Sequence, residues 1–232
     1  MKKVISFSLW GDNPTYNIGA IKNAELALII YPGFECWFYI HKDTVPRNTI
    51  DELQHFFHVK IIFKEGNLSI NKPMMWRFET IDDEDVEVML VRDTDTRILL
   101  REKLAVDEWL QTDKRFHIMR DHPHHTFCIL GGMFGSKKIP EIKSWIEIMD
   151  TVVQSGIRDY DQTFLQNYIY PIIKNDCVIH SSFNSIEPQC KPFPIKYDIQ
   201  FRFVGEYVYH DESRSSEHIN ILYNNIHISN QI

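Results

Sequence analysis

Short apolar runs alternate with helical patterns in the first part of the chain. The runs that predict strands are residues 3–9, 35–41, 59–63 and 86–91. Between the first two, residues 17–30 carry small and apolar side chains at helical spacing, until Pro32 and Gly33 end the pattern. Strands separated by helices predict an α/β protein with a mostly parallel sheet that is covered by helices on both faces.

The order of elements changes after residue 110. We expect short strands at residues 116–119, 129–134 and 178–180, and amphipathic helices at residues 141–153 and 161–173. From Pro188 onward the chain is first proline-rich and then aromatic, which predicts mixed strand and loop.

Composition narrows the class of protein. The chain has 232 residues, of which 44% are hydrophobic and 25% charged, as is ordinary for a soluble globular domain. A net charge of −7 argues against nucleic-acid binding, which needs a concentrated field of lysines and arginines. The sequence shows no signal-peptide pattern and no apolar stretch that could span a membrane. Its four cysteines lack C-x-x-C spacing, so we expect reduced thiols and a cytoplasmic location.

Two aspartates follow the fourth predicted strand, in the motif R-D-T-D-T-R at residues 92–97. Alternate side chains of an extended segment point to the same side, so Asp93 and Asp95 can converge on one hard cation such as Mg²⁺ or Mn²⁺. In parallel sheets, ligands bind beyond the carboxyl ends of the strands, which is where this pair lies. The alternative is a polar strand end in which the aspartates pair with Arg92 and Arg97.

The motifs around this acid pair resemble those of glycosyltransferases with the GT-A fold. The likeness is closest to a small viral and bacterial group that includes the N-terminal domain of a chlorella-virus glycosyltransferase. The motifs that carry it are S-F-S-L-W-G (6–11), W-R-F (76–78), R-D-T-D-T-R (92–97), H-I-M-R-D-H-P (117–123), I-L-G-G-M-F-G (129–135) and D-Q (161–162). They are spread in order over residues 4–183, and beyond Pro188 the likeness is thin.

The resemblance implies one GT-A domain with a Rossmann-like nucleotide-binding half. That half, which binds the nucleotide sugar, would be residues 1–97, followed by a sugar and acceptor half at 98–187 and a divergent tail at 188–232. The implied activity is metal-dependent transfer of a sugar to a hydroxyl of a glycan or other glycoconjugate. A UDP-sugar is the preferred donor, with glucose weakly preferred, and a viral protein would act in the host cytoplasm.

The resemblance also assigns the donor contacts. Leu9, Trp10 and Gly11 would hold the base and ribose, with Trp10 stacking on the base; simple packing is the alternative for this tryptophan. Asn17 and Arg77 are candidates for ribose or phosphate, because a guanidinium fork suits a diphosphate. The alternative for Arg77 is a surface ion pair with Glu79 or Asp82.

In the same comparison Asp95 is the stronger metal ligand, and Asp93 contacts ribose or metal. The implied cofactor is Mn²⁺ or Mg²⁺. His180 occupies the position of a late histidine ligand, while His210 and His227 are weaker candidates because they lie in the tail.

The segment R-D-H-P-H-H at residues 120–125 is rich in histidine. A structural zinc site needs four nitrogen or sulfur ligands, and Cys128 is the single cysteine nearby, so we favour a loop that faces sugar and acceptor. Gly131 and Gly132 would let backbone N–H groups approach a ligand, although a plain turn explains them too.

Asp161 and Asp121 are the candidate catalytic carboxylates. Either would serve an inverting enzyme as general base, whereas a retaining enzyme requires none, so the stereochemical course stays open. Helix capping is the alternative role for Asp161. The remaining candidates for substrate binding are Arg92, Thr94, Arg120, His122 and Gln162.

Two other functions compete with glycosyl transfer. A sugar-nucleotide nucleotidyltransferase shares the layout and the acidic metal site, but it needs a glycine-rich basic loop after the first strand, which residues 9–17 lack. A non-catalytic module that binds nucleotide sugars is the third candidate, and it would bind the donor without turnover.

Overall fold

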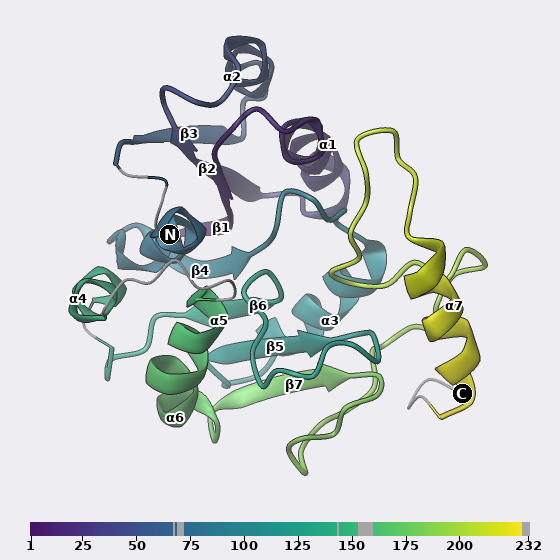
Figure 1. The fold of residues 1–232 in the computed structure, drawn as a ribbon. Coiled ribbons are helices and arrows are strands. Elements are labelled where there is room, and N and C mark those ends of the chain that lie inside the picture. The colour runs from purple at the N-terminus through teal and green to yellow at the C-terminus, as the bar shows by residue number, and fades with distance from the viewer. Residues whose placement is uncertain (67, 69–71, 143, 153–159, 229–232) are drawn as a thin grey trace.

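The computed structural model describes residues 1–66, 68, 72–142, 144–152 and 160–228. Its centre is a seven-stranded sheet in the order β3-β2-β1-β4-β6-β5-β7, which runs from top to bottom in Figure 1. The strands are β1 (Lys2–Leu9), β2 (Phe34–His41), β3 (Val59–Lys64), β4 (Val86–Val91), β5 (Phe116–Arg120), β6 (Phe134–Lys137) and β7 (Cys177–Ser181).

Helices cover both faces of the sheet. The helices are α1 (Pro14–Ile30), α2 (Arg47–Gln54), α3 (Leu100–Leu110), α4 (Trp145–Thr151), α5 (Tyr160–Phe164), α6 (Tyr170–Ile173) and α7 (Ser216–Asn225). Short segments of other helical geometry are η1 (Lys72–Asp82), η2 (Leu165–Ile169) and η3 (Ile226–Ile228). The predicted α/β class with a mostly parallel sheet is confirmed. Among the described helices, none is long and apolar enough to cross a bilayer.

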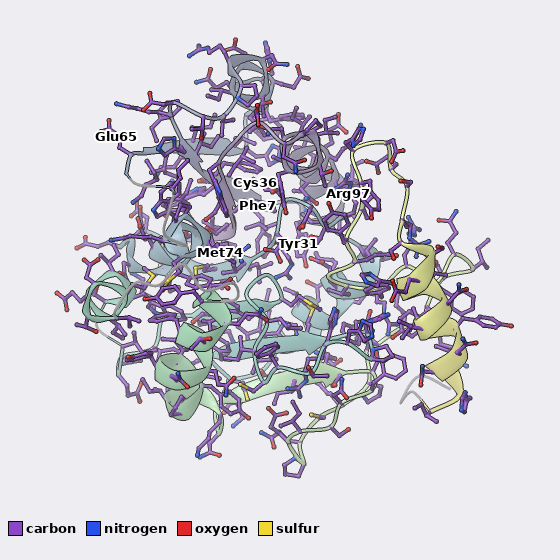
Figure 2. All side chains as sticks on the ribbon, in the orientation of Figure 1. Phe7, Tyr31, Cys36, Glu65, Met74 and Arg97 are labelled. Atoms are coloured by element: carbon purple, nitrogen blue, oxygen red, sulfur yellow. The ribbon has the colours of Figure 1, made fainter. Side chains whose placement is uncertain are left out.

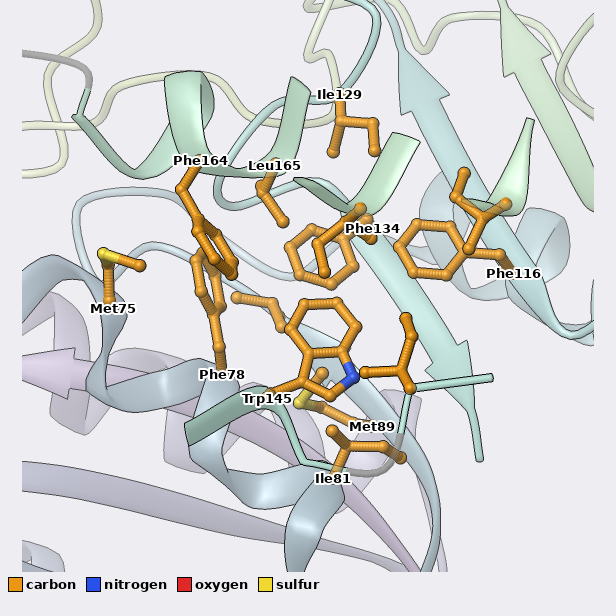
Figure 3. Close-up of a cluster of buried hydrophobic side chains, with 14 of the residues drawn as sticks. Met75, Phe78, Ile81, Met89, Phe116, Ile129, Phe134, Trp145, Phe164 and Leu165 are labelled. Atoms are coloured by element: carbon orange, nitrogen blue, oxygen red, sulfur yellow. The ribbon is translucent and has the colours of Figure 1, made fainter. Parts of the chain in front are cut away.

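Alternation along the strands produces a separate core on each face of the sheet. In β4, Val88 and Leu90 pack in the layer that contains α1, α2 and α3, whereas Met89 and Val91 face η1, α4 and α5. In the second layer, the aromatic rings of Phe78, Phe116, Phe134, Trp145 and Phe164 pack together with aliphatic side chains and methionines (Figure 3). Phe134 lies with its ring centroid 5.3 Å from that of Phe116.

Strand β6 is antiparallel to both of its neighbours, β4 and β5, while the other pairs are parallel. Phe134, the first residue of β6, pairs with Val91, the last residue of β4. The segment that precedes β6 therefore lies at the carboxyl edge of the sheet, beside the D-T-D motif that follows β4.

Several predicted elements differ in detail. The strand expected at residues 129–134 is wrong, because residues 130–133 form a turn closed by a hydrogen bond from Met133 N–H to Leu130 O (3.1 Å). The helix expected at 161–173 is interrupted by η2, since Pro171 has no N–H to continue the helical pattern. Only Trp145–Thr151 of the predicted helix 141–153 is helical, and residues 143 and 153 lie outside the described ranges.

The C-terminal segment is attached to the sheet by a buried polar cluster around Asp121, at the end of β5. Arg101 of α3 donates to both carboxylate oxygens (2.8 Å each), and Ser182 Oγ (2.6 Å), Tyr197 OH (2.8 Å) and Val204 N–H (2.9 Å) donate to them as well. Asp121 is fully buried, and both of its carboxylate oxygens accept hydrogen bonds from these interior groups. The prediction that Asp121 acts as a general base is therefore wrong, because the carboxylate is structural.

Replacing Asp121 by Ala leaves the buried Arg101 without a counter-charge. We expect the free energy of unfolding to fall by about 3–5 kcal/mol, as for other broken buried pairs. Denaturant titration measures the loss, and limited proteolysis should cut within residues 183–203 of the variant. Asp51→Ala, which removes the exposed pair with Arg47, is the control and should cost less than about 1 kcal/mol. Equal stability of the two variants would contradict this account.

Candidate functional site

A cavity of about 670 Å³ opens at the carboxyl edge of the sheet. Its walls come from the loop after β1, the D-T-D turn after β4, the turn before β6, the start of α5 and the C-terminal segment. The predicted site residues that line it are Leu9, Trp10, Gly11, Arg77, Asp93, Thr94, Asp95, Gly131, Gly132, Asp161 and Gln162. Its volume is within the range of pockets for small ligands, roughly 300–1,000 Å³.

Asn17 of α1 holds the loop that follows β1. Its side-chain amide donates to Gly11 O (3.1 Å) and Asn13 O (2.9 Å), and the side chain is buried. Gly11 has a φ of +74°, a conformation that glycine adopts without strain. The half-buried Trp10 lines the cavity. Asn17 is absent from the lining, so its predicted contact with ribose or phosphate is wrong; it positions the loop instead.

Helix α1 also supports the D-T-D turn. Asn23 donates from Nδ2 to Thr96 O (2.8 Å) and accepts from Ile98 N–H (3.0 Å). Gly19 approaches the turn so closely that a Cβ there would lie 1.9 Å from Thr94 O. The backbone of the turn is therefore fixed by groups of α1, and the aspartate side chains are left to face the cavity.

The arginines on either side of the acid pair do not neutralise it. Arg92 is buried with Glu102 (2.9 Å) and donates to the carbonyls of Val91 and Phe134. Arg97 pairs with Glu212 (2.8 Å). The alternative in which both aspartates pair with these arginines is therefore excluded, and so is the predicted role of Arg92 in substrate binding.

Arg77 is the cation that meets the acidic groups. One Nη donates to Asp93 and to Arg92 O (3.0 Å), and the other donates to Asp161 Oδ2 (3.1 Å). The expected partners Glu79 and Asp82 are engaged elsewhere, since Glu79 pairs with Lys64 and Asp82 caps α4. Arg77 thus joins the turn after β4 to the start of α5.

The lining carries more negative than positive charge. The described lining residues include four carboxylates, those of Asp12, Asp93, Asp95 and Asp161, whereas Arg77 alone is a cation. Burial and the nearby Asp93 carboxylate raise the pKa of Asp95 to about 7. Burial also raises the pKa of Asp161, and Arg77 offsets part of that effect. The cavity therefore favours a ligand that brings positive charge to Asp93 and Asp95.

The glycine pair before β6 makes room for two carboxylates. A Cβ on Gly131 would lie 2.2 Å from Asp161 Oδ2, and a Cβ on Gly132 would lie 1.9 Å from Asp93 Oδ2. Any side chain would displace these groups. The glycines therefore serve close packing against the acidic residues, a reason that the sequence pattern did not reveal.

Three further site predictions are wrong because the side chains lie in the interior. Arg120 forms an ion pair with Glu187 and donates to Cys128 O (3.1 Å). His122 donates from Nε2 to His218 O (3.0 Å) and packs on Phe203. His180 contacts His117 (2.8 Å) and Glu108 (3.2 Å). None of the three lines the cavity.

Because His180 lies away from the cavity, the acid pair lacks the expected third protein ligand. Throughout residues 1–66, 68, 72–142, 144–152 and 160–228, no three His, Cys, Asp or Glu side chains gather closely enough to hold a metal ion. The described histidines at residues 120–125 form no such group either. Asp93 and Asp95 could hold a metal only together with ligands from a substrate or water.

Several lining residues were not predicted, including Asp12, Asn13, Tyr16, Met74, Gly205 and Tyr207. His125 also lines the cavity and belongs to the histidine-rich loop that was expected to face the sugar and the acceptor. Asp12, Asn13 and Tyr16 adjoin Trp10 and Gly11, so their proximity to the site could have been inferred. Tyr207 belongs to the tail, where no motif or periodicity marks it.

Comparison with known proteins gives little further information. No family model matches the sequence, and no curated protein matches it either. A solved structure described as a cytidylyltransferase from Leptospira borgpetersenii serovar Hardjo-bovis is 13% identical, with a TM-score of 0.46. That comparison covers 100% of this chain and 97% of the other. The resemblance to viral and bacterial glycosyltransferases thus rests on the motifs alone.

Buried histidines should make the fold sensitive to acid. Burial lowers the pKa of His122 to about 4 and of His180 to about 4, so both stay neutral in the folded chain when unfolded histidines ionise. As pH falls from 6.5 toward 4, the unfolded state binds more protons and the free energy of unfolding decreases. Each histidine should contribute about 2 kcal/mol of this loss by pH 5.

Urea titrations at pH 7 and pH 5 test this expectation. The double variant His122→Asn/His180→Asn should lose less stability between the two pH values than the unmodified chain. His55→Asn, which changes an exposed histidine that follows α2, is the control and should keep the original dependence. If all three proteins show the same dependence on pH, the explanation is wrong.

Proposed function

We propose that the chain is a metal-dependent glycosyltransferase that transfers a sugar from a nucleotide diphosphate donor, preferably a UDP-sugar, to an acceptor hydroxyl. One observation carries the proposal: Asp93 and Asp95 face a nucleotide-sized cavity at the carboxyl edge of the sheet with an excess of negative charge. A divalent ion together with a diphosphate supplies the complementary charges.

The donor atoms fit Mn²⁺ or Mg²⁺. Both are hard cations, and Mg²⁺ is commonly held by one or two carboxylates together with substrate phosphates. Asp93 and Asp95 would be the protein ligands. When bound, the ion neutralises charge that develops on the leaving diphosphate.

The remaining lining residues suit a donor that extends along the edge of the sheet. Trp10 and Gly11 follow β1, and we assign the base and ribose to this end. Arg77 lies next to Asp93 and offers its guanidinium to the diphosphate. Asp161 and Gln162, at the start of α5, would contact the transferred sugar or the acceptor hydroxyl.

A sugar-nucleotide nucleotidyltransferase is the second candidate, because the same cavity and acid pair could serve its chemistry. That reaction requires a triphosphate to be held, and cations normally do so. Residues 9–17 contain neither lysine nor arginine, and Arg77 is already engaged with two carboxylates. Glycosyl transfer is therefore favoured. Release of pyrophosphate from an NTP and a sugar 1-phosphate would reverse this order.

Calorimetry with a panel of nucleotide sugars, with and without Mn²⁺, tests the proposal. We expect UDP-sugars to bind only with the ion, and Asp95→Asn to lower Mn²⁺-dependent UDP-glucose hydrolysis by about a hundredfold. Asp85→Asn changes an exposed carboxylate that precedes β4 and should have no effect. Binding of no UDP-sugar, together with an unaltered Asp95→Asn variant, would refute the proposal; binding without turnover would indicate a non-catalytic module.

The two glycines should have separable effects. Gly132→Ala pushes Asp93 away and should raise the Mn²⁺ concentration needed for half-maximal UDP binding by about tenfold. Gly131→Ala displaces Asp161 instead, so it should slow UDP-glucose hydrolysis at an unchanged Mn²⁺ requirement. Titration of both variants with Mn²⁺ makes the comparison. An identical Mn²⁺ requirement in Gly132→Ala and in the unmodified chain would disprove the role of Asp93.

A further inference from the structure

The C-terminal segment enters the cavity on the side of β6. Gly205, with a φ of +79°, approaches Met133 so closely that a Cβ would lie 2.3 Å from its sulfur. Three residues later, Val208 N–H donates to Asp95 O (2.8 Å). Between these two contacts, Tyr207 lines the cavity. The side chain of Tyr207 is therefore presented between the turn before β6 and the D-T-D turn.

The position of Tyr207 is fixed by residues that adjoin the acid pair. Arg97 pairs with Glu212 (2.8 Å) and also donates to Tyr209 O (3.5 Å). Arg97 lies beside the C-terminal segment, which is yellow in Figure 2. Tyr209 N–H donates to Ser213 O (2.9 Å), which closes the segment into a narrow loop. Tyr207 thus belongs to a loop that is held on both sides.

His125 also lines the cavity, and its ring centroid lies 5.9 Å from that of Phe203, on the segment that leads to Gly205 and Tyr207. Asp121 N–H donates to His125 Nδ1 (3.0 Å), and a backbone N–H can only donate, so Nδ1 is the acceptor. The hydrogen of the neutral ring is therefore on Nε2. Burial and the neighbouring histidines lower the pKa of His125 to about 3, so the ring stays neutral near pH 7.

The order of the strands places these residues beyond the nucleotide. Along the carboxyl edge, the loop after β1 is followed by the D-T-D turn after β4 and then by the turn before β6. Adjacent strands are about 4.8 Å apart, so β6 lies roughly 10 Å from β1. A donor with its base at β1 and its diphosphate at β4 would extend its sugar toward Tyr207 and His125.

We propose that Tyr207 and His125 form a hexose subsite, in which the tyrosine ring packs on the apolar C–H face of a pyranose and His125 Nε2–H donates to a sugar hydroxyl. The subsite rests on the proposed function, because it assumes a nucleotide sugar in this cavity. An aromatic ring supplies a rigid apolar surface, and a neutral imidazole supplies a directed hydrogen bond without charge.

Calorimetry with UDP and with UDP-glucose, both in the presence of Mn²⁺, tests the subsite. UDP lacks the sugar, so UDP binding reports on the fold and on the nucleotide site. Tyr207→Ala should weaken UDP-glucose binding by about tenfold and leave UDP binding unchanged. His125→Ala should weaken UDP-glucose binding by about fivefold, again without an effect on UDP. Tyr207→Phe keeps the ring and should bind both ligands normally.

The chain provides matched controls for both substitutions. Tyr223→Ala removes a tyrosine that is 60% exposed and belongs to α7, outside the cavity lining, and His55→Ala removes an exposed histidine that follows α2. Both controls should bind UDP and UDP-glucose as the unmodified chain does. The subsite is refuted if Tyr207→Ala and His125→Ala leave UDP-glucose binding unchanged, or weaken UDP to the same extent. Failure of the unmodified chain to bind UDP with Mn²⁺ would instead refute the proposed function.

Discussion

One buried guanidinium holds the acidic groups of the cavity together. Arg77 contacts Asp93, which follows β4, and Asp161, the second residue of α5, so a single charge joins segments that are far apart in sequence. Gly131 and Gly132 pack against the same two carboxylates. Asp95 remains beside Asp93 in a partly buried setting, where a second positive charge would be favourable. Arg77 is the single cation among the described lining residues, so the site favours a ligand that brings further positive charge.

A second buried pair determines which segments can contribute to the cavity. Arg101 and Asp121 bind Ser182, Tyr197 and the backbone of Val204, and thereby bring the chain beyond β7 back across the carboxyl edge of the sheet. Gly205 and Tyr207 reach the cavity directly after this anchor. The tail is therefore part of the candidate site, although the motifs of the sequence end before it begins.

The sequence predicts the sheet better than it predicts the site. Apolar runs reveal β1, β2 and β4 because these strands are buried on both faces, and a shorter run reveals β3 at the partly exposed edge of the sheet. The acid pair is visible because it follows the run that forms β4. The helices α3 and α7 were not predicted. A strand or helix can be located from the residues within it, whereas the partner of a charged side chain can lie far away in the sequence.

The errors in the site share that physical cause. Arg92, Arg120, Asp121, His122 and His180 were predicted to contact ligands, yet each is buried with a partner at least ten residues away. Sequence spacing does not reveal such pairings.

The antiparallel strand β6 has a related consequence. Because Phe134 pairs with Val91 in the ladder, the glycine turn and the acid pair are aligned by the register of β4 and β6, and a slip of one residue would turn every side chain of the strand to the opposite face. The relative position of the glycine turn and the acid pair therefore depends on the pairing of β4 with β6. That pairing tolerates surface substitutions but not an insertion within either strand.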